Sequence, residues 1–195
     1  MLAPAFADPV HDSQRTFRAV MNALAHPGAI TPIVAAVASP LPLAPAAAAI
    51  ALTLLDYETP VWLDGALAVT PGIADWFRFH TGASITSDQG AAAFAFIADI
   101  AQAPSFETFA LGSTEYPDRS TTLVLQVERF SAGESIKLCG PGIAGTRRLA
   151  AGLLPSRFCE QWADNRELFP RGVDVILVTD SEIAALPRSV RILTD

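Results

Sequence analysis

The chain has 195 residues, which suits one domain with a sizeable hydrophobic core, so we expect a single domain over residues 1–195. Its formal net charge of −7 argues against a nucleic-acid-binding protein that works by neutralising phosphates. Hydrophobic residues make up 51% and charged residues 17%, which suggests that a partner covers part of an apolar surface.

The cysteines and the N-terminal segment predict a cytoplasmic protein. Cys139 and Cys159 have neither C-x-x-C spacing nor the pattern of a disulfide framework, so we expect reduced thiols. The N-terminus carries Asp8 and Asp12 and lacks the basic region of a signal peptide. Residues 30–55 are uncharged, but prolines interrupt them and no basic residues flank them, so we expect no membrane span.

In the N-terminal half, apolar spacing predicts a helix over residues 11–25, capped by Asp12 or Ser13. Its apolar stripe comprises Phe17, Val20, Met21 and Leu24. An extended run over residues 30–38, a proline-rich loop and a buried helix over residues 45–55 follow. Residues 61–64 are typical of a strand, residues 71–82 of a short helix, and residues 92–97 of a second strand.

In the C-terminal half, residues 104–109 predict a single helical turn. The segment over residues 120–130 is rich in Thr and Val and is the clearest strand. Residues 131–133 then turn the chain into a strand over residues 135–139, which predicts a hairpin. Residues 155–168 fit a helix, residues 173–178 a strand buried on both faces, residues 181–186 a short helix, and residues 190–193 a closing strand.

The interleaving of these strands and helices predicts the fold class. We expect an α/β fold in which one domain holds a mixed β-sheet flanked by helices. The hairpin over residues 120–139 would make part of that sheet antiparallel.

Residues 140–145 spell G-x-G-x-x-G, the pattern of a dinucleotide-binding turn. The strand before the pattern is the second arm of the expected hairpin, and Pro141 has no N–H group to offer a phosphate. A helix starting at residue 146 would favour cofactor binding, but Asp164, near the position of the usual ribose-binding acid, lies in a helical pattern. A tight turn, in which glycine supplies unusual backbone angles and proline adds stiffness, is the better interpretation.

Anion and metal sites receive weaker support. The arginines that could meet an anion near this turn are Arg119, Arg147, Arg148 and Arg171. Solvated or acid-paired arginines are commoner on protein surfaces. The three histidines lack metal-ligand spacing. His80 precedes Thr81-Gly82, so a capping role is its first interpretation. Its loop position still makes it a better functional candidate than His26.

Two further residues, Lys137 and Cys139, are candidate catalytic groups. Lys137 alternates with Ile136 and Leu138, so we expect it to face solvent rather than to carry pyridoxal phosphate. Cys139 ends a strand, and a buried thiol is a better description than a nucleophile. The residues alone therefore predict no catalytic constellation.

Several short stretches, in one order over nearly the whole chain, carry a family resemblance. They are Phe17-Arg18, Ala25–Gly28, Leu55–Thr59, Phe79–Gly82, Gly112–Pro117, Ser120–Val124, Leu138–Ile143, Phe169–Asp174 and Leu186–Arg188. In these stretches the chain resembles the H subunit of the bacterial carbon–phosphorus lyase core complex, which degrades phosphonates.

The resemblance implies a fold similar to the large domain of pyridoxal-phosphate-dependent transferases, without that cofactor, and we expect no cofactor at all. It implies G, I and J subunits as partners and a homodimer when the subunit is isolated. With the L protein, the G, H and I subunits are credited with forming α-D-ribose 1-methylphosphonate 5-triphosphate from ATP and methylphosphonate, releasing adenine. The nucleosidase chemistry is placed on the I subunit, so we expect an assembly subunit rather than a catalytic one.

A second hypothesis gives the subunit its own nucleotide or phosphonate site near the turn over residues 140–145. The candidate ligand or partner surface comprises His80, Thr81, Arg119, Gly140, Pro141, Gly142, Arg171 and Asp174. A free-standing dinucleotide enzyme is a third hypothesis, from another class. We expect that the chain binds no metal ion, no nucleic acid and no membrane.

Overall fold

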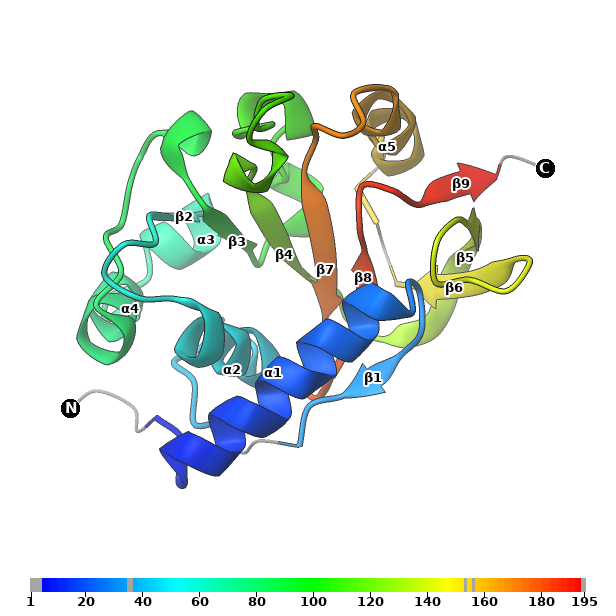
Figure 1. Ribbon diagram of the computed structural model, residues 1–195. Helices are drawn as coiled ribbons and strands as arrows, with labels where there is room; N and C mark the ends of the chain where they lie inside the picture. The colour runs from blue at the N-terminus through cyan, green and yellow to red at the C-terminus, as the bar shows by residue number, and fades with distance from the viewer. Residues whose placement is uncertain (1–4, 35–36, 153, 156, 194–195) are drawn as a thin grey trace.

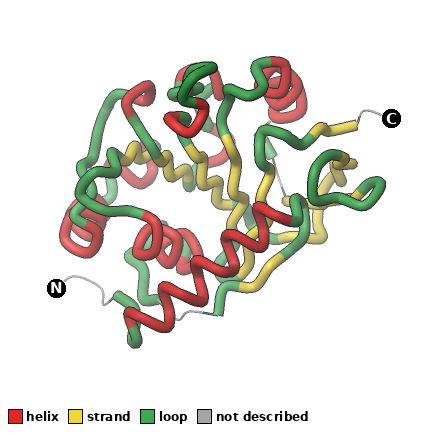
Figure 2. Tube along the Cα trace, in the orientation of Figure 1, coloured by secondary structure: helices red, strands yellow, loops and turns green. Residues whose placement is uncertain are grey.

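Apolar strands form the centre of the molecule, shown as a ribbon in Figure 1 and as a tube coloured by secondary structure in Figure 2. The computed structural model describes residues 5–34, 37–152, 154–155 and 157–193. The strands of the main sheet are β1 (Thr31–Pro32), β2 (Val61–Leu63), β3 (Phe94–Ile97), β4 (Thr122–Gln126), β7 (Asp174–Val178) and β8 (Glu182–Leu186). Their order across the sheet is β1-β8-β7-β4-β3-β2.

The main sheet is mixed, as predicted. Strands β2, β3, β4 and β7 run parallel, whereas β8 is antiparallel to both β7 and β1. Alternate residues of the inner strands belong to two separate apolar cores, with Val124 and Ile176 in one and Leu123 and Val175 in the other. Both faces of the sheet are therefore buried, which explains why these strands are continuously apolar.

Helices cover one face of the sheet (Figure 1). They are α1 (Pro9–Ala25), α2 (Pro45–Leu54), α3 (Gly65–Ala68) and α4 (Ile73–Thr81). Residues 46–51 of α2 are all buried, and five of these six residues are alanine, whose small side chains allow neighbouring elements to approach closely. The side chains of Trp76 and Phe77 on α4 are fully buried in the same core.

The second face carries α5 (Phe158–Glu167) and a small antiparallel sheet. The strands of the small sheet are β5 (Phe130–Cys139), β6 (Arg147–Ala151) and β9 (Arg191–Leu193), in the order β6-β5-β9. The described part of the chain also holds four 3₁₀ turns that connect elements: η1 (Gln89–Ala91), η2 (Ile100–Gln102), η3 (Phe106–Thr108) and η4 (Pro117–Arg119). On α5, the rings of Phe158 and Trp162 stack with centroids 6.1 Å apart, and Phe106 of η3 meets Phe158 edge-on at 5.7 Å.

The predicted hairpin over residues 120–139 is wrong. Strand β4 lies inside the main sheet between β3 and β7, whereas β5 begins at Phe130 and pairs with β6 and β9 in the small sheet. Leu123, Val124 and Leu125 are completely buried, which two parallel neighbours and two covered faces achieve and a local hairpin does not. The hairpin of this region is formed by β5 and β6, so the alternative of a helix from residue 146 is also wrong.

The short helix predicted over residues 181–186 is wrong as well. Residues 183–186 are fully buried in β8, which pairs with strands on both sides. A tight turn precedes this strand, since the Thr179 N–H donates to the Glu182 carbonyl at 2.9 Å and the Glu182 N–H donates to the Thr179 hydroxyl at 3.0 Å. Sheet pairing overrides the helical propensity of Glu and Ala here.

Helix α1 differs from its prediction at its cap and its exposed face. Its N-cap is Asp8, which accepts the His11 N–H at 3.1 Å, whereas Asp12 is buried inside the helix. Phe17 and Met21, half of the predicted apolar stripe, are 49% and 50% exposed. The helix therefore presents apolar side chains on its outer surface.

The remaining predicted elements are confirmed within a few residues, although α3 was not predicted. The extended run over residues 30–38 is reduced to β1, and its residues 35–36 lie outside the described residues. In the part of the chain that the structure describes, no helix is long and apolar enough to span a membrane. The single domain over residues 1–195 and the likeness to pyridoxal-phosphate-dependent transferases stay predictions.

Candidate functional site

Asp174, at the start of β7, is held by an arginine that the sequence analysis did not select. Its Oδ1 accepts the backbone N–H of Arg188 at 2.7 Å and the Nε–H of the same residue at 3.1 Å, and Oδ2 contacts Arg188 Nη2. Nη1 of Arg188 donates to the Pro117 carbonyl at 2.6 Å. The two side chains are 21% and 14% exposed. This pair therefore links β7, η4 and the segment after β8.

Arg119 and Arg171 lie at the same end of the main sheet as Asp174, where β4 and β7 begin. Arg119 ends η4 and is exposed, with its guanidinium carbon 4.3 Å from the centroid of the Tyr116 ring. Arg171 is half-buried beside Gly172, whose N–H donates to the Leu111 carbonyl at 2.8 Å. Because Leu111 bridges to Ser120, the backbone brings Arg119, Arg171 and Asp174 into one region.

The turn over residues 140–142 packs against the protein itself. Gly142 has φ +80°, and a Cβ placed there would lie 2.2 Å from the Ala25 carbonyl oxygen. Gly140 approaches Ser189, the neighbour of Arg188, with 3.2 Å between its ideal Cβ and the Ser189 carbonyl oxygen. Arg147 Nη1 donates to the carbonyls of His26 and Pro27 at 3.0 and 2.8 Å. These glycines thus allow a close approach to the end of α1 and to the connection between β8 and β9.

His80 and Thr81 lie elsewhere, at the C-terminus of α4. The Thr81 hydroxyl donates to the Phe77 carbonyl at 2.7 Å and accepts the Ala83 N–H at 3.1 Å, which makes Thr81 a capping residue. The His80 ring lies 5.0 Å from the rings of both Trp76 and Phe79. Helix α4 lies near the β2 edge of the main sheet (Figure 1), and β3 and β4 separate β2 from β7.

The sequence-predicted surface therefore divides into two parts. Arg119, the turn over residues 140–142, Arg171 and Asp174 lie near Arg188, whereas His80 and Thr81 lie apart. Whether any of them binds a ligand or a partner stays a prediction. Cys139, expected as a buried thiol, is only half-buried. Among the described residues, no cluster of three His, Cys, Asp or Glu side chains is placed to hold a metal ion.

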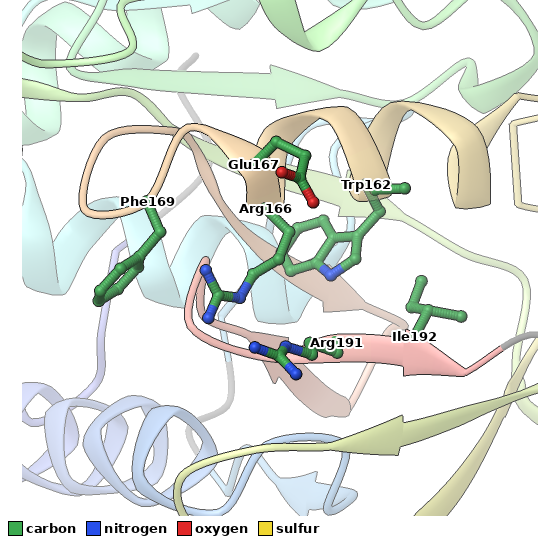
Figure 3. Close-up of a pocket in the computed structure, with 7 residues that line it drawn as sticks. Trp162, Arg166, Glu167, Phe169, Arg191 and Ile192 are labelled. Atoms are coloured by element: carbon green, nitrogen blue, oxygen red, sulfur yellow. The ribbon is translucent and has the colours of Figure 1, made fainter.

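A cleft that no sequence pattern predicted lies between α5 and β9 (Figure 3). It has a volume of about 560 Å³ and is lined by Trp162, Ala163, Arg166, Glu167, Phe169, Arg191 and Ile192. The guanidinium carbon of Arg166 lies 4.7 Å from the centroid of the Phe169 ring. Arg166 and Arg191 are 25 positions apart, so only the packing of α5 on β9 brings them together, and no local pattern could have found the pair.

At the other end of α5, a third arginine, Arg157, forms an ion pair with Glu160. Arg157 donates from Nε and Nη2 to the Glu160 carboxylate at 3.0 and 2.8 Å. These hydrogen bonds lower the pKa of Glu160 below its ordinary value and raise the pKa of Arg157. Arg157 is thus already paired.

A second hollow, of about 510 Å³, lies at the carboxyl ends of β3, β4 and β7. Its charged lining residues are Asp99, Glu128 and Asp180, and no arginine or lysine occurs among the described residues that line it. An acidic lining repels phosphate and phosphonate groups, so this hollow does not suit such ligands.

Comparisons with known proteins cover almost the whole chain. A family model described as "Bacterial phosphonate metabolism protein (PhnH)" matches residues 4–193. The chain is 45% identical over 188 residues to the "Alpha-D-ribose 1-methylphosphonate 5-triphosphate synthase subunit PhnH" of Rhizobium meliloti (strain 1021), which covers 96% of this chain and 94% of that protein. It is 39% identical over 82 residues to the "Putative C-P lyase subunit protein HtxG" of Stutzerimonas stutzeri, which covers 42% of each chain.

Proposed function

Because the chain belongs to the PhnH family of bacterial phosphonate metabolism proteins, we propose that it is a subunit of a carbon–phosphorus lyase core complex. The observation that carries this proposal is the 45% identity to a synthase subunit over 96% of the chain. The family resemblance drawn from the sequence is confirmed.

The proposed role is to support the transfer of methylphosphonate to C1 of the ribose of ATP, with release of adenine. The proposed partners are the G, I and J subunits, and the chain assembles the enzyme rather than carrying out the chemistry. Two of the polar residues discussed above are already used inside the protein: Asp174 binds Arg188, and Thr81 caps α4. This internal use supports a structural role for them.

Exposed apolar side chains support an assembly role. Large apolar residues that are at least 49% exposed include Val10, Phe17, Met21, Val34, Leu41, Tyr57, Val69 and Phe79. Three of them, Val10, Phe17 and Met21, lie on α1. Apolar surface gathered on one element is typical of a protein–protein contact. We further propose that the chain works in the cytoplasm and forms a homodimer when isolated.

Reconstitution tests the assembly role. The chain is co-expressed with the G, I and J subunits of the same genome and isolated through a tag on this chain. Adenine release from ATP and methylphosphonate is then measured after addition of the L protein. We expect the four subunits to elute together and adenine release to require this chain. Full adenine release by the G, I, J and L proteins without this chain, or elution of the chain alone, would contradict the proposal.

The alternative proposal is a nucleotide or phosphonate site near residues 140–145. The position of Arg119 and Arg171 near Asp174, at one end of the main sheet, favours this proposal, because two arginines can bind a phosphate group. Calorimetric titration of Arg119→Gln and Arg171→Gln with ATP tests it. We expect each substitution to weaken ATP binding if the site exists, and wild-type affinity in both variants would exclude it.

A further inference from the structure

We propose that the cleft between α5 and β9 binds the phosphoryl or phosphonate group of a small organic molecule between the guanidinium groups of Arg166 and Arg191. This site goes beyond the assembly role. It adjoins the turn over residues 140–145, because Arg191 pairs with Cys139, but no residue of that turn lines the cleft. Its ligand class follows from the chemistry of the lining residues (Figure 3).

Arg166 has a buried donor that lacks a partner. Its Nε is inaccessible to solvent and makes no hydrogen bond within the described part of the chain. Protein therefore encloses the base of the guanidinium, and only the rest of the group can meet a ligand. The guanidinium carbon lies 4.7 Å from the centroid of the Phe169 ring, and this cation–π contact favours that position of the side chain. The side chain is thus oriented before any ligand arrives.

Arg191 supplies the second positive charge from another element. It is the first residue of β9, between buried Val190 and half-buried Ile192, and its side chain is exposed. Figure 3 shows its guanidinium on the same side of the cleft as that of Arg166. Neither arginine makes an ion pair with an acid within the described residues, in contrast to Arg157 and Arg188. Two neighbouring cations favour the binding of an anion between them.

The lining of the cleft indicates which anion fits. Two guanidinium forks match the several oxygens of a phosphate or phosphonate, which carries up to two negative charges. Glu167 at the cleft is exposed and supplies one negative charge, so the lining keeps a net positive charge. Phe169, 51% exposed, offers an apolar surface to the organic part of the ligand. The volume, about 560 Å³, is within the range of small-molecule sites.

A purely structural role for Arg166 explains less. A cation in the last turn of α5 is favourable because of the helix dipole, and the contact with Phe169 adds to that. Such a role does not involve Arg191. The proposed anion lies between the two guanidinium groups and so gives both side chains a role.

Calorimetric titration of the full-length chain at low salt tests this proposal, with inorganic phosphate, methylphosphonate and ATP as three separate probes. Arg191→Gln removes one guanidinium group from an exposed strand position. Arg166→Lys keeps the positive charge but removes the bidentate guanidinium group. Arg129→Gln is the matched control, because Arg129 is also exposed and lies outside the cleft. We expect either cleft substitution to weaken binding by about ten-fold, and the control to leave it unchanged. Urea unfolding confirms that each variant is folded.

The three probes identify the source of the anion. Binding of all three points to a general phosphoryl site, and binding of methylphosphonate or ATP without phosphate shows that the organic part contributes. No binding of any probe at millimolar concentration overturns the proposal. So does equal weakening by Arg129→Gln, which indicates unspecific attraction. The choice of methylphosphonate and ATP rests on the proposed function. A failed titration leaves the reconstitution result untouched, and a failed reconstitution leaves phosphate binding to be measured.

Discussion

At the scale of single residues, Gly142 shows why the fold requires a glycine at one position of the G-x-G-x-x-G pattern. Its φ of +80° and its approach to the Ala25 carbonyl exclude any side chain, because an ideal Cβ would lie 2.2 Å from that oxygen. Gly145, the last glycine of the same pattern, has φ +75° and no atom within 4 Å of its ideal Cβ. The two glycines therefore share a backbone conformation and differ in packing.

This difference gives the first prediction. We expect Gly142→Ala to lower the free energy of unfolding by about 3 kcal/mol, because a clash with backbone adds to the strain of positive φ. Gly145→Ala carries only the strain and is expected to cost about 1 kcal/mol. Urea unfolding of both variants measures the difference. Equal losses of unfolding free energy in the two variants would show that the contact with α1 is unimportant. They would then favour a ligand-binding role for the turn.

The second prediction concerns Asp64, a carboxylate that is only 4% exposed. Its Oδ1 accepts the Leu67 N–H at 2.9 Å, and Oδ2 accepts the N–H groups of Ala98 and Asp99 at 2.8 and 2.7 Å. Asp64→Ala leaves these three donors without an acceptor. We expect a loss of about 3 kcal/mol or more in the free energy of unfolding, measured by urea denaturation.

Asp75→Ala is the control for Asp64. Asp75 is exposed on α4, and its ion pair within the described residues is with Arg78, at 3.2 Å. Such surface pairs contribute about 0–1 kcal/mol, so the control should unfold nearly as the wild type does. Similar losses in both variants would mean that the three buried hydrogen bonds carry no special weight.

At the scale of secondary-structure elements, local sequence patterns predicted most helices but not the pairing of strands. Helices α1, α2, α4 and α5 follow from apolar spacing and from proline or glycine at their ends. The order of strands depends on which faces are buried, and this is a property of the whole molecule. Thus β4 resembles a hairpin arm locally but is covered on both faces, and β8 has a helical composition but pairs on both edges.

The candidate site was predicted to a similar extent. The sequence pointed to Arg119, Arg171 and Asp174, and the fold brings these three into one region. It could not identify Arg188 as the partner of Asp174, because 14 positions of strand and turn separate them. Arg166 and Arg191 were missed because each looks ordinary within its own helix or strand. Only the packing of α5 on β9 makes them neighbours.

The third prediction concerns the N-terminus of α1. The Asp8 carboxylate accepts the His11 N–H and lies 2.8 Å from His11 Nδ1, and these hydrogen bonds lower the pKa of Asp8 below its ordinary value of 3.8. A carboxyl whose pKa is lowered by folding stabilises the folded state above that ordinary value. The stabilisation disappears as pH falls through the lowered pKa.

We therefore expect Asp8→Ala to have a lower urea midpoint than wild type at pH 7 and to approach the wild-type midpoint as pH falls below 3.8. The midpoints of both proteins between pH 7 and pH 3 check this. Ser13→Ala serves as the control, since residue 13 was an alternative cap in the sequence analysis. A larger effect at Ser13, or a difference that is constant with pH, would contradict the assignment of Asp8 as the cap.

At the scale of the whole molecule, the layered fold leaves α1 with apolar groups on both its inner and its outer side. The inner face of α1 buries Val20 and Ala23 against the core. Its outer side exposes Val10, Phe17 and Met21 by 64%, 49% and 50%. Because the inner face already anchors the helix, the outer side chains are free to contact another protein. We propose that this protein is one of the G, I and J subunits.

The fourth prediction tests this contact. In the double substitution Phe17→Glu and Met21→Glu, two charges replace apolar side chains, each of which is worth about 1.5–3 kcal/mol when buried. We expect at least a ten-fold loss of co-purification with the G, I and J subunits. The urea midpoint should barely change, because both positions are exposed in the isolated chain. Val69→Glu is the matched control, since Val69 is 79% exposed and lies at the C-terminal end of α3, a different helix. Undiminished co-purification of the double variant would exclude α1 as the contact, whereas loss of the homodimer alone, seen by gel filtration, would assign this face to self-association.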